Sequence, residues 1–158
     1  MAENTAEKNS QTCVLVSGGI ESVVLLNDAL SRYESVTPVY VQNHLRWEDV
    51  ELFWLKKFLR NIKSTKLKPL KVIDLTMRDL YDGHWSLTGT HVPGPGSKDD
   101  AVYLPGRNIA LLSKAAIFAA LNGICFIEIG VLGGNPFSDS SKSFFGQGRP
   151  CAEYQSRV

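Results

Sequence analysis

Long apolar runs are absent from this sequence. Of its 158 residues 44% are hydrophobic, yet nowhere do about 18 apolar residues follow one another, as a membrane-spanning helix needs. Residues 1–12 are polar and lack the apolar stretch of a secretory leader. We therefore expect no membrane partner and a cytoplasmic protein.

Cysteine is also scarce. Three cysteines, Cys13, Cys125 and Cys151, lie far apart without a CxxC pair, so the sequence predicts neither a disulfide framework nor a zinc site of the usual spacing. Cys13 and Cys125 lie in apolar runs, where we expect small buried thiols.

Charge of either sign is not in excess. Lys and Arg number 17 and Asp and Glu 16, which gives a formal net charge of +1. No overall field attracts nucleic acid or an anionic membrane, and we expect neither as a partner. A local basic patch stays open.

The chain alternates between short β-branched apolar runs and longer segments of helical periodicity. We expect strands at residues 13–17, 36–41, 70–75 and 125–132, and helices at residues 21–32, 49–62 and 108–121. Pro38 cannot donate to a ladder, so we expect it near the start of its strand. Residues 108–121 are apolar nearly all round, which predicts a well-buried helix that ends at Asn122-Gly123.

This alternation predicts an α/β fold with a mostly parallel sheet and helices on both faces. Ligands of such sheets bind beyond the carboxyl ends of the strands, where the strand order reverses. We expect one domain at residues 13–145 between a disordered polar tail at 1–12 and an irregular or disordered tail at 146–158. Residues 76–105, rich in Gly and Pro, predict a long loop, and structureless loops of that length are often functional.

Residues 17–22 lie between the first expected strand and the first expected helix. They read Ser17, Gly18, Gly19, Ile20, Glu21 and Ser22. Loop N–H groups and a helix N-terminus together favour a bound anion, glycines let the backbone approach it closely, and serine hydroxyls can donate to it. A tight turn followed by a helix-capping Ser22 is the alternative interpretation.

Two phosphate-binding motifs are missing from this position. The sequence contains no GxxxxGK[ST] and no GxGxxG after the strand, which excludes a Walker-type loop and a dinucleotide fingerprint. Any phosphate site here is of another kind.

The stretch from Val14 to Ser22 resembles the SGGxDS signature of the PP-loop ATP pyrophosphatases. A second block, from Tyr103 to Asn108, contains Pro-Gly-Arg-Asn and resembles the PGRN block of the 7-cyano-7-deazaguanine synthases of queuosine biosynthesis. Gly130-Val131 followed by Phe137-Ser138-Asp139 resembles that family's next block. The resemblance implies a three-layer, Rossmann-like adenine nucleotide α-hydrolase fold.

The resemblance also implies an activity. Such an enzyme cleaves ATP to AMP and pyrophosphate to activate a carboxylate, here 7-carboxy-7-deazaguanine, which ammonia converts to an amide and then a nitrile. ATP and Mg²⁺ are the implied cofactors. By motif, the implied cofactor-binding residues are Ser17, Gly18, Gly19, Glu21, Ser22, Gly106, Arg107 and Asn108, of which Arg107, Ser22 and Glu21 are also the implied catalytic residues.

Individual residues keep alternatives. Arg107 is interpreted as a second phosphate clamp, because a cation at a helix N-terminus favours a bound anion nearby. Asn108 either caps its helix or binds the ligand. Ser138 and Asp139 either contact substrate or form an ordinary turn. His44 follows a strand and could face the nucleotide.

His84 and His91 lack Cys or acidic partners at metal-binding spacing, so we expect no protein ligands for a metal. The Mg²⁺ that the resemblance implies would bridge phosphate oxygens. Members of the family carry four zinc-binding cysteines toward the C-terminus, where this chain has Cys151 alone. Glu21 stands where the signature has Asp and moves the carboxylate outward by about 1.5 Å. Both departures support a second hypothesis, a catalytically impaired nucleotide-binding module.

A PP-loop enzyme that acts on tRNA is a third hypothesis, disfavoured by the near-neutral charge. Phe53, Trp54 and Phe58 give the second expected helix more aromatic surface than one sheet face covers, which suggests a homodimer contact.

Overall fold

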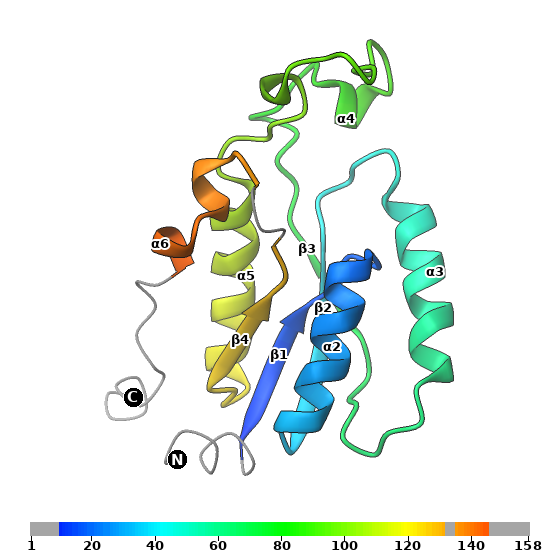
Figure 1. Ribbon diagram of the computed structural model, residues 1–158, viewed down its shortest axis with the longest axis vertical. Coiled ribbons are helices and arrows are strands. Elements are labelled where there is room, and N and C mark those ends of the chain that lie inside the picture. Colours follow the sequence, from blue (N-terminus) through cyan, green and yellow to red (C-terminus); the bar gives the residue numbers. More distant parts are fainter. Residues whose placement is uncertain (1–9, 132–134, 146–158) are drawn as a thin grey trace.

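The computed structural model describes residues 10–131 and 135–145. In them, four parallel strands form one sheet in the order β3-β2-β1-β4. The strands are β1 (Gln11–Leu15), β2 (Ser35–Gln42), β3 (Lys71–Asp74) and β4 (Phe126–Ile129). The longer helices are α2 (Ile20–Arg32), α3 (Glu48–Asn61) and α5 (Arg107–Leu121). The α/β prediction is confirmed (Figure 1).

The first strand lies two residues earlier than expected. Gln11 pairs with Ser35 and Thr12 with Val36, because a parallel ladder joins backbone groups and tolerates polar side chains at its start. Gln11 and Thr12 therefore belong to the sheet rather than to a polar tail. The tail predictions for residues 1–9 and 146–158, with Cys151, lie outside the described residues.

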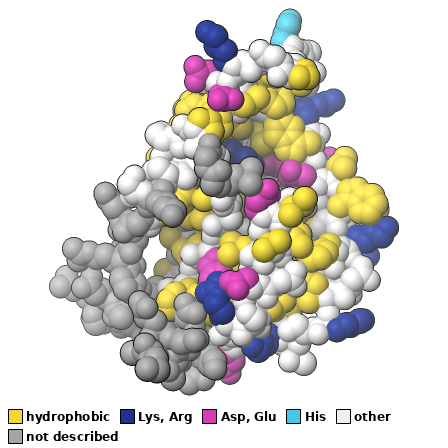
Figure 2. Space-filling view, in the orientation of Figure 1, with side chains coloured by type: hydrophobic (Ala, Val, Ile, Leu, Met, Phe, Trp, Pro, Cys, Tyr) yellow, Lys and Arg dark blue, Asp and Glu magenta, His cyan; other side chains and the backbone are white. Residues whose placement is uncertain are grey.

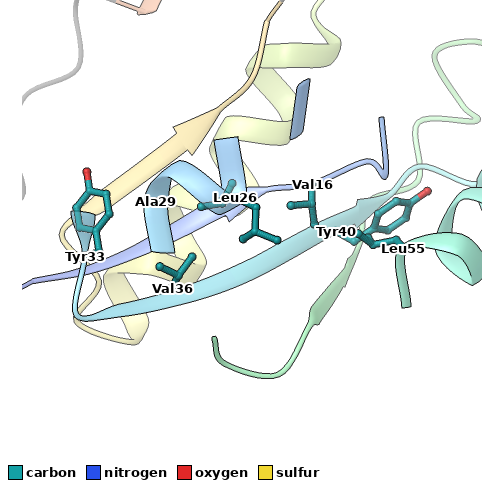
Figure 3. Packing of buried hydrophobic residues seen from close by; sticks show 8 residues of the cluster. Val16, Leu26, Ala29, Tyr33, Val36, Tyr40 and Leu55 are labelled. Carbon is teal, nitrogen blue, oxygen red and sulfur yellow. The ribbon is translucent and has the colours of Figure 1, made fainter. Parts of the chain in front are cut away.

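Side chains of β1 alternate between the two faces of the sheet, as the period of two requires. Val14 and Val16 face α2 and α3, where they form a buried cluster with Leu26 and Leu55 (Figure 3). Cys13 and Leu15 face α5 and pack with residues of that helix. The helices therefore cover both faces, and the predicted three layers are confirmed.

The helix α5 is less buried than its composition predicts. Ala115 and Ala119 are buried against the sheet, whereas Ile117 and Leu121 are 60% and 81% exposed. A single helix touches a sheet along one stripe, so its other apolar side chains face outward. The prediction of a well-buried helix is wrong, although its end is confirmed, since Asn122 caps α5 and Gly123 has a φ of +66°.

The two described cysteines differ in burial. Cys13 is fully buried in β1 as expected, and burial raises the pKa of its thiol to about 12. Cys125 is exposed, which contradicts the prediction. It lies in the connection between α5 and β4, where the chain has not yet entered the sheet.

Pro38 is the fourth residue of β2 and pairs with Val14 in the middle of the ladder, not near the strand start. The amide of Val36 donates to the carbonyl of Lys66 on the β3 side, and every second amide of a strand points the same way. Regular pairing with β3 starts only at Val39. The ring nitrogen of Pro38 therefore faces a gap in the pairing, which costs no hydrogen bond.

Residues 76–105 contain local structure rather than one structureless loop. They include the short helix α4 (Trp85–Thr88) and the 3-10 turn η1 (Asp99–Ala101). The Trp47 and Trp85 rings stack at 5.4 Å, and the amide of Arg46 donates to the carbonyl of Ser86 at 2.9 Å. These contacts hold the segment against the chain between β2 and α3, above the carboxyl ends of the strands (Figure 1).

The outer face of α3 exposes two of its three predicted aromatic side chains. Phe53 and Trp54 are 61% and 56% exposed, whereas Phe58 packs against the buried cluster that contains Leu26 and Leu55. Hydrophobic and basic side chains lie side by side over α3 in Figure 2.

None of the helices in the described residues has the length and apolar character that a membrane span requires.

Candidate functional site

A pocket opens at the carboxyl ends of β1, β2 and β4. The chain runs from β1 through β2 to β3 in one direction across the sheet, and β4 then joins the other side of β1. The strand order thus reverses between β1 and β4, the expected place for a ligand. The pocket is lined by Leu15, Val16, Ser17, Glu21, Ser22, Tyr40, Val41, Glu51, Arg107, Asn108, Leu111, Ile129 and Gly130.

The loop at residues 17–22 is held by its own hydroxyl groups. The hydroxyl of Ser22 donates to the carbonyl of Gly19 at 2.9 Å and accepts from the amide of Ser17 at 3.3 Å. The hydroxyl of Ser17 accepts from the amide of Gly19 at 3.3 Å. Ser22 is buried and braces the loop, and the N-cap of α2 is Gly19. The capping interpretation of Ser22 is therefore wrong.

At Gly18 the loop adopts a backbone conformation that glycine tolerates far better than other residues. Its φ of +83° lies in the left-handed region, and a Cβ atom there would lie 3.5 Å from the carbonyl oxygen of Glu51. The loop thus turns sharply against α3 and directs the first turn of α2 to the pocket. Glu21 and Ser22 in the first turn of α2 line the pocket, so the positive end of the helix dipole faces it. No side chain caps this N-terminus.

Gly130 allows α2 to approach the end of β4. A Cβ atom at Gly130 would lie 3.4 Å from the backbone carbon, backbone oxygen and Cβ of Glu21. In the sequence, Gly130 is only part of the Gly130-Val131 block that resembles the family, and no local pattern predicts its close contact with Glu21. Glu21 itself is exposed in the first turn of α2 and lines the pocket.

Arg107 reaches the same pocket from the first residue of α5. Gly106 is the N-cap of this helix, with a left-handed φ of +74°. Arg107 is half-buried, and its Nε atom is buried without a hydrogen-bond partner among the described residues. A buried guanidinium donor without a partner is costly, and an anion in the pocket would satisfy it.

Asn108 lines the pocket, and its amide and side-chain groups are hydrogen-bonded to Asp139 and Ser140. A carboxylate oxygen of Asp139 accepts from the amide of Asn108 at 3.1 Å, and the Asn108 side chain donates to the Asp139 carbonyl and the Ser140 hydroxyl, each at 3.0 Å. Asp139 is buried in the 3-10 turn η2 (Ser138–Ser140). Asp139 thus caps α5, and of the two alternatives for Asn108 the capping one is wrong.

Most predicted site residues meet at the pocket, but the predicted substrate residues do not line it. Ser17, Glu21, Ser22, Arg107 and Asn108 line the pocket, and Gly18, Gly19 and Gly106 form the backbone beside them. Ser138 is exposed and Asp139 is bound to α5.

Two residues that sequence reasoning missed complete the lining. The buried Tyr40 on β2 donates its hydroxyl to Oε2 of Glu51 on α3 at 3.1 Å. Burial raises the pKa of the Glu51 carboxyl, while the Tyr40 hydrogen bond and the charge of Arg107 lower it. No motif contains them, and only the fold brings β2, α3 and α5 together here.

His44 contacts residues beside the pocket and is not part of its lining. His44 has a φ of +64°, and its Nε2 lies 2.5 Å from a carboxylate oxygen of Asp74. The buried Glu48 accepts from the amides of Asn43 and His44 at 2.9 and 2.7 Å, which fixes this turn. His44 does not line the pocket.

His84 bonds Ser86 through Nδ1, and His91 is exposed. Within the described residues, no group of three or more His, Cys, Asp or Glu side chains could hold a metal ion.

The chain matches known proteins over most of its length. The sequence model of a family described as queuosine biosynthesis protein QueC matches residues 11–152. A relative from Desulfitobacterium hafniense called 7-cyano-7-deazaguanine synthase 1 is 29% identical over 139 residues, which cover 85% of this chain and 61% of the relative. A 7-cyano-7-deazaguanine synthase from Leptospira interrogans is 31% identical over 139 residues, which cover 82% of this chain and 53% of the relative.

The matched region spans between about half and three fifths of these curated relatives. It contains every element around the pocket, from β1 to α6 (Lys142–Phe145). The family match agrees with the resemblance that residues 14–22 and 103–108 carry. The chain belongs to the QueC family of queuosine biosynthesis proteins, within the PP-loop superfamily.

Proposed function

We propose that the pocket binds ATP, with the phosphates between the N-terminus of α2 and Arg107, and that the protein activates a carboxylate for nitrogen transfer. One observation carries the proposal. An uncapped helix N-terminus and a buried guanidinium nitrogen without a partner meet in one pocket at the reversal of strand order. Each favours an anion, and together they suit the several oxygens of a polyphosphate.

The chemistry follows from where charge develops. Attack of a carboxylate on the α-phosphorus of ATP forms an acyl-adenylate and releases pyrophosphate, whose new negative charge Arg107 would stabilise. Ammonia then displaces AMP to give an amide. We propose 7-carboxy-7-deazaguanine as the carboxylate, because relatives carry the name 7-cyano-7-deazaguanine synthase.

Magnesium suits the oxygen atoms at this site. The carboxylate of Glu21 and the hydroxyl of Ser17 line the pocket, and hard oxygen ligands are those that Mg²⁺ prefers. We propose that Glu21, in the position of the signature aspartate, holds the ion, which would neutralise phosphate charge. Zinc does not suit the described residues, where Cys13 is a buried thiol of raised pKa and Cys125 lies alone.

Product analysis tests this function. Incubation with ATP, Mg²⁺, ammonia and 7-carboxy-7-deazaguanine should release AMP and pyrophosphate only when all four are present, and the product should have the mass of the amide or nitrile. Absence of both AMP and pyrophosphate would exclude the activity.

A nucleotide-binding module without catalysis is the second candidate. One observation favours it: Glu21 stands where the signature has aspartate. This candidate predicts that ATP binds but is not cleaved. If ATP binds without cleavage, Glu21→Asp tests this explanation, because AMP formation by that variant would assign the loss of catalysis to the position of the carboxylate.

A further inference from the structure

Glu51 is an unexpected residue in a pocket for phosphates. It lines the pocket from the first turn of α3 and carries a carboxylate that would repel an anion. Arg107 lines the same pocket from α5. Among the described lining residues, Arg107 is the only one with a basic side chain. The Glu51 carboxylate and the Arg107 guanidinium therefore share one pocket.

Tyr40 fixes the Glu51 carboxylate in place. Its hydroxyl donates to Oε2 of Glu51 at 3.1 Å, and its ring is anchored in the core beside Leu55 (Figure 3). Tyr40 is 2% exposed and is the fifth residue of the eight-residue strand β2. The hydrogen bond from Tyr40 therefore ties the Glu51 carboxylate to the sheet and restricts its movement.

The other charged groups around Glu51 come from each neighbouring element. Glu48, on the same helix, is engaged with the amides of Asn43 and His44. Glu21 lines the pocket from α2, and Arg107 from α5. Burial and the charge of Glu48 raise the pKa of the Glu51 carboxyl, whereas the Tyr40 hydrogen bond and Arg107 lower it. Acidic side chains are visible in the middle of the face shown in Figure 2.

We propose that Glu51, held by Tyr40, is a positioning residue for Arg107 and competes with the anionic ligand for its guanidinium. Without ligand, the Glu51 carboxylate and the Arg107 guanidinium attract each other across the pocket that both line. A bound phosphate takes the guanidinium over, and Glu51 then faces added negative charge, which favours its protonation. Phosphate binding and proton uptake by Glu51 are therefore coupled. This inference rests on the proposed binding of ATP phosphates.

Binding of inorganic pyrophosphate without Mg²⁺ tests the coupling. Dissociation constants are measured by calorimetry from pH 5 to 8 for the wild type and for Glu51→Gln. Their ratio at each pH cancels the ionisation of pyrophosphate itself. We expect Glu51→Gln to bind about fivefold more tightly at pH 8, the lower range for coupled sites, and the ratio to approach one as the pH falls and wild-type Glu51 is protonated.

Asp49→Asn is the matched control, because it removes the same charge from the exposed side of the same helix turn. It should bind pyrophosphate like the wild type at every pH. Tyr40→Phe removes the hydrogen bond that lowers the Glu51 pKa. In Tyr40→Phe, Glu51 should therefore stop competing with pyrophosphate at a higher pH than it does in the wild type. A merely structural role of Tyr40 would not produce this shift.

Thermal unfolding shows whether Glu51→Gln folds. The pKa of Glu51 is raised in the folded state, so the folded protein binds the proton more tightly and wild-type stability falls as pH rises through the interval between the unfolded and folded pKa values. The glutamine variant lacks this loss, so its relative unfolding temperature should rise with pH.

A ratio independent of pH, or weaker binding by Glu51→Gln at pH 8, would overturn the inference while leaving the proposed function intact. If the wild type binds neither pyrophosphate nor ATP, the proposed function itself fails, and this inference fails with it. If Glu51→Gln does not fold, the shift in Tyr40→Phe decides, and an unchanged pH profile of that variant would contradict the competition.

Discussion

Two helix N-termini meet at the pocket, and they are finished in opposite ways. At α2 no side chain provides a cap, and Gly19 precedes the first turn. At α5 the carboxylate of Asp139 accepts from the amide of Asn108, and the amide of Arg107 donates to the carbonyl of Leu104. The dipole of α2 is therefore available to a ligand, whereas that of α5 is neutralised by the protein.

This difference assigns separate roles to the two helices. The helix α2 offers backbone groups beside the pocket, which suit a phosphate of any orientation. The helix α5 offers the side chain of its first residue, Arg107, while Asp139 binds the backbone amide of the next residue, Asn108. The account therefore expects binding to depend on the Arg107 side chain at α5 and on backbone shape at α2.

Arg107→Ala should have the largest effect on ligand binding. It removes a charged donor from the pocket, and hydrogen bonds to charged groups contribute about 1.5–3 kcal/mol, or roughly 10- to 100-fold in affinity. Calorimetry with ATP and Mg²⁺ measures the loss. Arg107→Lys keeps the charge but loses the planar set of guanidinium donors, so its affinity should lie between those of the wild type and Arg107→Ala. Equal affinity of Arg107→Ala and wild type would remove α5 from the site.

Asp139→Ala should weaken both stability and binding. It leaves the amide of Asn108 without its acceptor, and loss of a helix cap costs about 0.5–2 kcal/mol. Urea unfolding measures the stability, and pyrophosphate titration shows whether Arg107 has lost its position. Asp139→Asn keeps an oxygen acceptor and is the matched control. Unchanged stability of the alanine variant would contradict the capping role.

Substitutions in the loop before α2 should separate backbone shape from side-chain chemistry. Gly18→Ala places a Cβ atom on a residue with φ of +83° and should destabilise by about 1–2 kcal/mol. At Gly19 the φ is −72°, and a Cβ atom would meet mainly the flexible Glu21 carboxylate at 3.2 Å. Gly19→Ala should therefore cost less in thermal unfolding. The reverse order would show that the loop conformation is not the one described.

The sequence predicted the order of the strands and helices well, because apolar periodicity and the glycine breaks report directly on backbone structure. The sequence also indicated the pocket residues of the two motifs, because a short motif specifies the backbone geometry of its own segment. Tyr40 and Glu51 escaped prediction, since each is unremarkable in its own element and they meet only through the crossover of β2 and α3.

The errors also have physical causes. Asn108 looked like a cap because asparagine favours helix starts, but Asp139, 31 residues later, supplies the cap from another segment. The apolar composition of α5 predicted a helix buried on all sides, yet the sheet covers only one side of this helix. In each case a distant contact, absent from any local pattern, decided the outcome.

The smallest expected effect concerns the outer face of α3. If Phe53 and Trp54 form the proposed homodimer contact, replacing both with serine should yield monomers in sedimentation, with little change in stability because both are more than half exposed. Ile117→Ser on the exposed side of α5 is the control and should leave the assembly unchanged. A monomeric wild type at high concentration would remove the contact.

The central claim is that phosphates bind between the start of α2 and Arg107. A crystal structure with Mg²⁺ and an ATP analogue that cannot be cleaved between the α- and β-phosphates tests it most directly. The account predicts phosphate density at residues 17–22 with the Arg107 guanidinium within hydrogen-bonding distance of a phosphate oxygen. Nucleotide bound elsewhere, or Arg107 turned away from the phosphates, would contradict it.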